Sequence, residues 1–145
     1  MKMKFLARKF RAFLLAGVPV FCGISVAHAA GTEWAPIPLS RTMANAAHDP
    51  SGIWSDDDMA GNGDIWRAEM TLHNPERKVE IEQLVNGNCG SPSTCPVKVI
   101  EHEGAQSKTL LDGDELCAAG ASFMIDRNLT AIKACGQTLK LGQHK

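Results

Sequence analysis

The clearest pattern in the chain is a period of two in its apolar positions, which begins after residue 50. Val79 and Ile81 alternate with Lys78, Glu80 and Glu82, and this alternation predicts a strand with one buried and one exposed face. Further short runs of the same kind are bounded by turn residues. The candidate strands are Gly52–Ser55, Ile65–Leu72, Lys78–Val85, Pro96–Glu101, Ser107–Leu111, Ala121–Asp126 and Leu129–Leu141.

Turn-forming residues separate these runs. Asn74-Pro75-Glu76, Asn86-Gly87-Asn88 and Asp112-Gly113-Asp114 predict turns, Arg127-Asn128 predicts a hairpin, and Gly136 predicts a bend in the last run. Six or seven short strands predict a mainly β fold, a small antiparallel barrel or sandwich. An α+β fold stays an alternative, because Glu115–Ala119 could form a helical turn.

Residues 30–50 have a different composition, with three prolines and several alanines. Ser40 is a suitable N-cap for a short helix across Arg41–His48, and Pro50 would end it. We therefore expect an N-terminal arm or short helix in residues 30–50. A single disulfide-containing, β-rich domain is expected to follow in residues 51–145.

Residues 1–29 carry the three regions of a secretory signal peptide. Met1–Phe13 holds five basic and no acidic residues, Leu14–Val26 is apolar, and Ala27-His28-Ala29 supplies the small residues of a cleavage site. The apolar stretch is shorter than the about 20 residues of a membrane helix, although an uncleaved anchor stays an alternative. We expect Sec-type export to a bacterial periplasm or the medium, with no membrane span after cleavage.

Removal of the signal peptide changes the charge of the chain. The 145 residues have a formal net charge of −1, whereas the 116 residues after position 29 hold ten basic and 16 acidic side chains, a net charge of −6. Nucleic-acid binding needs clustered Lys and Arg, so we set that class aside. The charge favours a partner among exported or envelope proteins, in particular a cationic one.

Four cysteines remain after residue 29, and an even number in a small exported domain indicates disulfides. We expect the pairs Cys89–Cys95 and Cys117–Cys135 among the three pairings that four cysteines allow. Their spacings do not match the Cys pairs of structural zinc sites or the C-x-x-C of redox sites. The first pair would close a loop that contains Ser91, Pro92 and Ser93.

The densest acidic stretch runs from Asp56 to Asp64, and Asp56, Asp58 and Asp64 fit three positions of a calcium loop. Arg67 stands where that loop requires a bidentate Glu, so this is not an EF-hand. An irregular calcium site stays a weak alternative to a solvated loop. Trp54 and Trp66 flank the stretch, and we expect them to pack together beneath it; exposed, they would mark a ligand or partner surface.

No constellation for catalysis is visible, since the sequence has neither a Gly-x-Ser-x-Gly elbow nor a His-Glu-x-x-His motif. His102 lies between Glu101 and Glu103, but strand geometry points these carboxylates to the opposite face. We therefore assign no catalytic residue and expect no cofactor.

These features favour a small exported, non-catalytic binding module, such as an inhibitor, immunity or accessory factor, that acts through protein–protein contact. The alternative is a small periplasmic metal-binding protein or enzyme with its site at the Asp56–Asp64 loop. The candidate binding residues are Ser91, Pro92, Ser93, Asp56, Asp57, Asp58, Trp54 and Trp66. The sequence leaves the partner and the oligomeric state open.

Overall fold

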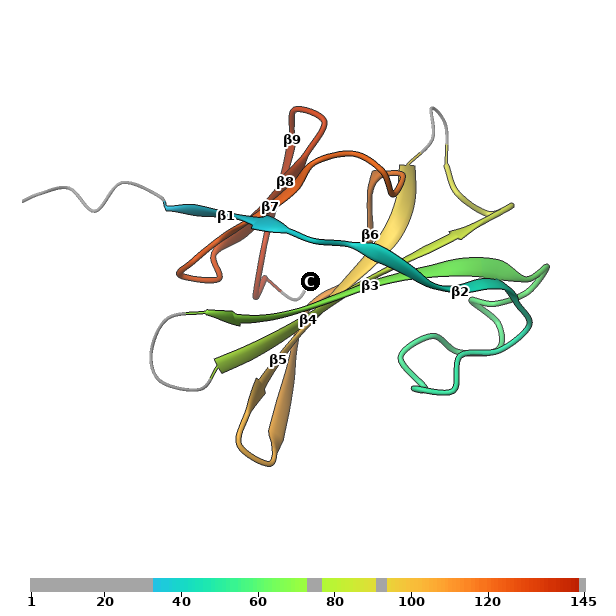
Figure 1. The fold of residues 1–145 in the computed structure, drawn as a ribbon, viewed down its shortest axis with the longest axis horizontal. Coiled ribbons are helices and arrows are strands. Elements are labelled where there is room, and N and C mark those ends of the chain that lie inside the picture. The colour runs from blue at the N-terminus through green and yellow to red at the C-terminus, as the bar shows by residue number, and fades with distance from the viewer. Residues whose placement is uncertain (1–32, 73–76, 91–93, 144–145) are drawn as a thin grey trace, which may run out of the picture.

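The computed structural model describes residues 33–72, 77–90 and 94–143 of the chain. These residues form nine strands in two antiparallel sheets and contain no helix, so the fold is mainly β and the α+β alternative is wrong (Figure 1). One sheet has the strand order β1-β7-β8-β9 and the other β2-β3-β4-β5-β6. The strands are β1 (Trp34–Ile37), β2 (Ser40–Ala46), β3 (Gly63–Leu72), β4 (Arg77–Asn86), β5 (Thr94–Glu103), β6 (Gln106–Cys117), β7 (Phe123–Asp126), β8 (Ala131–Ala134) and β9 (Gln137–Lys140).

The β-rich part of the chain follows its local pattern closely. β3, β4, β5 and β7 begin and end within two residues of the predicted strands. Leu129–Leu141 bends at Gly136 as expected and forms β8 and β9. The turns at Asn86-Gly87-Asn88 and Arg127-Asn128 are confirmed, whereas Asn74-Pro75-Glu76 and the predicted signal peptide lie outside the described residues.

The short helix predicted across Arg41–His48 is wrong. Ser40–Ala46, in spite of its alanines, forms β2 at an edge of the five-stranded sheet. Backbone hydrogen bonds to β3 outweigh a helix preference of at most about 0.7 kcal/mol per residue. Only Pro38 and Leu39 separate β1 from β2, so one chain segment passes from the first sheet to the second.

Two further predictions are wrong, one of a strand and one of a turn. Gly52–Ser55 is not a strand but part of the loop between β2 and β3. Asp112-Gly113-Asp114 is not a turn but an irregularity inside β6, across which the pairing register shifts between Val97 and Lys98. Gly113 has a φ of 78° there, which glycine adopts without steric strain.

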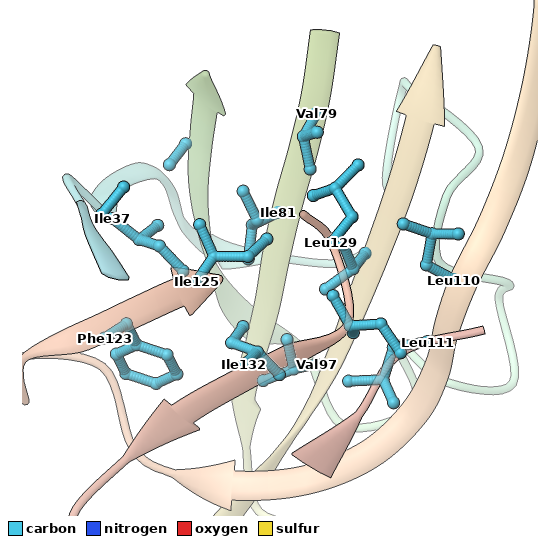
Figure 2. Packing of buried hydrophobic residues seen from close by; sticks show 14 of the residues in the cluster. Ile37, Val79, Ile81, Val97, Leu110, Leu111, Phe123, Ile125, Leu129 and Ile132 are labelled. Carbon is cyan, nitrogen blue, oxygen red and sulfur yellow. The ribbon is translucent and has the colours of Figure 1, made fainter. Parts of the chain in front are cut away.

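The inner faces of the two sheets pack against each other and form the main hydrophobic core (Figure 2). Ile81 from the five-stranded sheet and Phe123 and Ile125 from the other are each at most 1% exposed. Across the molecule from the β1–β2 connection, the amide of Gly142 donates to the carbonyl of Leu110 in β6 over 2.7 Å. The two sheets are therefore joined on both sides, as a closed sandwich.

Two disulfides, Cys89–Cys95 and Cys117–Cys135, confirm the expected pairing. Between them, the fully buried Gln83 donates its amide to the carbonyls of Cys95 (3.2 Å) and Cys117 (2.9 Å). Two disulfides are consistent with an oxidising, exported location. In the described part of the chain, no helix is long and apolar enough to cross a membrane.

Candidate functional site

The loop between β2 and β3, residues 47–62, lies on the outer face of the five-stranded sheet, at the right of Figure 1. Its Trp54 and Met59 are only 3% and 1% exposed, and they pack on Ile65 and Leu84, which point away from the main core. A second, smaller hydrophobic cluster therefore fixes this loop to the sheet. We call residues 47–62 the β2–β3 loop.

Asp49 organises the start of the β2–β3 loop. Its carboxylate accepts hydrogen bonds from the amides of Ser51, Ile53 and Trp54, each at 3.0 Å, and from the Ser51 hydroxyl at 2.6 Å. Burial alone would raise the pKa of Asp49, but the hydrogen bonds from Ser51 and Trp54 outweigh it, so its pKa is lowered. The ionised carboxylate thus holds the backbone that places Trp54 in the cluster.

Lys98 of β5 provides a second attachment for the loop. Its ammonium donates to the carbonyl of Ile53 over 2.9 Å and lies 4.7 Å from the ring centroid of Trp54. It also pairs with Asp58 at 3.7 Å and with Asp112 of β6 at 3.2 Å. Hydrogen bonds from Ser55, and then the charge of Lys98, lower the pKa of Asp58. Asp58 is therefore used within the fold.

Asp56 and Asp57 are the carboxylates of the loop that remain for a partner. Both are exposed, and among the described residues neither side chain has a hydrogen bond or an ion pair with another. They project from a segment whose neighbours Trp54 and Met59 are buried. The loop thus presents two negative charges from a fixed base.

The β2–β3 loop lies beside the disulfide-closed loop. The Asn86 side chain donates to the carbonyl of Asp58 over 3.0 Å, and the Asn88 side chain donates to the carbonyl of Ala60 over 3.4 Å. The next residue, Cys89, opens the loop that its bond to Cys95 closes. The β2–β3 loop therefore contacts the residues that directly precede Cys89, whereas the predicted binding residues Ser91, Pro92 and Ser93 lie outside the described residues.

The predicted packing of Trp66 with Trp54 is wrong. Ile65 points into the small cluster beneath the loop, so its neighbour Trp66 points to the opposite face of β3. Trp66 is half-buried there, opposite Gln83 of β4. Because Trp54 is buried as well, neither tryptophan forms an exposed aromatic surface on the loop.

The carboxylates proposed for a calcium site have different partners. Asp64 accepts from the Asn45 amide at 2.8 Å and pairs with Arg41 at 3.1 Å. The hydrogen bond from the Asn45 amide, and to a smaller extent the contact with Arg41, lowers the pKa of Asp64. Asp58 faces Ser55 and Lys98 instead. Within residues 33–72, 77–90 and 94–143, no group of three His, Cys, Asp or Glu side chains is placed to hold a metal ion.

A network of ionisable groups continues on the same outer face below the loop. Arg67 of β3 pairs with Glu80 at 3.2 Å, with the buried Glu82, and with Asp49 at 4.0 Å. Glu82 is 1% exposed, and its Oε2 has no hydrogen-bond partner among the described residues. Burial raises the pKa of Glu82 to about 7, against the opposing charge of Arg67. The Arg67 guanidinium thus lies within ion-pair distance of three carboxylates. With its raised pKa, Glu82 binds a proton near neutral pH.

His102 has a carboxylate partner that sequence reasoning missed. Glu101 turns to the other face as expected, where it is buried and pairs with Arg77 at 2.5 Å. Glu80 of the neighbouring β4 approaches the His102 Nε2 to 3.2 Å, and the Ser107 hydroxyl lies 2.8 Å from Nδ1. Only the strand register could have indicated Glu80, because it is distant in the sequence.

No protein-family model, curated protein or solved structure matches this chain. Its function is therefore argued from the geometry of its own side chains. Two regions of the outer face stand out, namely the acidic end with Asp56 and Asp57, and the charged strands around His102.

Proposed function

We propose that the protein is a small exported binding module that acts through protein–protein contact at its acidic end. The contact surface comprises Asp56, Asp57 and the adjoining Cys89–Cys95 loop. The observation that supports it is the hydrogen bonding of Asn86 and Asn88 to the β2–β3 loop, which links this loop to the residues directly before Cys89. The predicted signal peptide and the two disulfides support export.

Fixation of the loop favours binding because a pre-ordered surface loses less conformational entropy on association. Trp54 and Met59 of the loop pack on the sheet, and Lys98 of β5 contacts the Ile53 carbonyl and the Trp54 ring. The free carboxylates of Asp56 and Asp57 and the net charge of −6 after residue 29 favour a partner with a basic surface. Such charges accelerate encounter and select against acidic proteins.

The test is capture of partners from the exported protein fraction with the oxidised protein as bait, in the presence of a chelator. The Asp56→Asn/Asp57→Asn variant should lose a stoichiometric partner that the wild type retains. The control is Glu33→Gln/Glu103→Gln, which removes two charges from exposed positions elsewhere. Glu103 and Thr94 stand at opposite ends of β5. At about 3.4 Å per residue, these two residues are about 30 Å apart.

Two outcomes would contradict the proposal. Equal retention of the partner by both double variants would show that the acidic end is not the contact surface. Absence of any partner, together with a melting temperature that calcium raises by mass action, would support the alternative of a metal site at the Asp56–Asp64 loop.

A further inference from the structure

The outer face of the five-stranded sheet has an open groove at the end away from the β2–β3 loop. Its volume is about 420 Å³, and Glu69, Thr71, Lys78, Glu80 and His102 contribute to its lining. An adjoining depression of about 400 Å³ shares Thr71, Lys78 and His102 with it. The volume falls in the range of small-molecule sites, roughly 300–1,000 Å³.

The strand register arranges the charged side chains of this groove in two rows. Glu69 of β3 stands opposite Glu80 of β4, which forms a row of carboxylates. The next row on this face holds Thr71, Lys78 and His102, because Lys78 pairs with both of the others. One row therefore accepts hydrogen bonds and the other donates them.

Most of these groups are already satisfied, but two are not. Glu80 contacts Arg67 and His102, and the second ring nitrogen of His102 faces Ser107. Glu69 and Lys78 are exposed, and within the described residues their side chains have no hydrogen bond or ion pair. Arg67 and His102 already contact Glu80, so Glu69 is the carboxylate of this row that is left to bind a cation.

The spacing of the two rows along the backbone indicates the length of a ligand that would reach both. Glu69 and Thr71 are two residues apart on β3, which corresponds to about 7 Å along the strand. An extended dipeptide also spans about 7 Å, a single amino acid half of that and a tripeptide about 10 Å. A ligand with an ammonium and a carboxylate at dipeptide spacing would reach both rows at once.

We propose that this groove binds a zwitterion of dipeptide length, with its ammonium against Glu69 and its carboxylate against Lys78 and Thr71. His102 and Glu80 form the wall of the groove. This site is separate from the acidic end that we assign to protein contact, and it would hold whether or not that assignment does.

The experiment is an NMR titration of backbone amides with diglycine. Amide shifts around Glu69–Thr71 and Lys78–Glu80 should saturate with diglycine at a lower concentration than with glycine or triglycine. Diglycine with an acetylated amine and an amidated carboxylate should produce no saturable shift. Absence of a saturable shift with diglycine, or equal binding of the capped peptide, would overturn the proposal.

Variants test whether Glu69 and Lys78 bind the two charged groups of the ligand. Glu69→Gln and Lys78→Met should each weaken diglycine binding by about two- to fivefold, the range expected for an exposed ion pair. Asp114→Asn and Lys140→Met are the matched controls, because both residues are exposed and lie outside the groove. Unchanged affinity in both groove variants would also overturn the proposal. Asp56→Asn/Asp57→Asn should bind diglycine normally, so failure at one site is distinguishable from failure at the other.

Discussion

Replacement of Glu82 by Gln should remove a specific pH dependence from the stability of this protein. Glu82 is 1% exposed, and its Oε2 has no hydrogen-bond partner in the described residues. Arg67 compensates its charge only in part, because Arg67 also pairs with Glu80 and lies near Asp49. Gln has the shape of the protonated carboxyl group but cannot ionise.

The magnitude follows from the pKa of Glu82, which rises from an ordinary 4.5 to about 7 in the folded protein. Each pKa unit corresponds to about 1.4 kcal/mol, so the effect is about 3 kcal/mol. Below pH 4.5 the carboxyl group is protonated in both the folded and the unfolded chain. As the pH rises toward 7 the unfolded chain loses this proton first, so the free energy of unfolding falls, and above about pH 7 it levels off.

The assay is urea unfolding of wild type and Glu82→Gln between pH 4.5 and 8.5, followed by tryptophan fluorescence. The stability of the variant minus that of the wild type should rise by about 3 kcal/mol across this range. Glu103→Gln, at an exposed position, should run parallel to the wild type. A difference curve for Glu82→Gln that stays flat with pH would refute the reasoning, because Glu82 would then ionise without a penalty.

Other perturbations test the remaining contacts. Met59→Ala should destabilise the protein by about 2–3 kcal/mol, since it leaves a cavity in the small cluster under the β2–β3 loop. Hydrogen exchange of the backbone amides in the loop should then accelerate. Unchanged exchange would contradict the attachment of the loop by Met59. Cys117→Ser/Cys135→Ser should lower the free energy of unfolding by about 3 kcal/mol in urea titrations, because the disulfide closes a long loop. Gly113→Ala should lower the melting temperature and reduce the free energy of unfolding by about 1 kcal/mol, because the φ of Gly113 is 78°. Gly87→Ala is the control and should leave both unchanged, because Gly87 has no positive φ and a Cβ there would meet no atom within 4 Å.

The candidate site could be predicted only in part from the sequence. The acidic stretch at Asp56–Asp58 was visible as a run of charges, but its attachment by Lys98 was not, because a lysine distant in the sequence gives no local signal. The partner of His102 was missed for the same reason, since Glu80 comes from the adjacent strand. Proximity in the sequence predicts that Trp66 packs with Trp54, whereas strand alternation places Trp66 on the face of β3 opposite to that of Ile65.

Period-two alternation and turn residues are local properties, so they predict the β class and most strand positions, and the even number of cysteines after residue 29 predicts disulfides. The tertiary structure decided which polar residues of the alternating strands became buried. Glu82 occupies a position that the pattern in β4 assigns to solvent, yet it is 1% exposed and pairs with Arg67, which also lies 4.0 Å from Asp49 of the β2–β3 loop. Burial of that carboxyl group depends on contacts between segments far apart in the chain, and no local periodicity encodes these contacts.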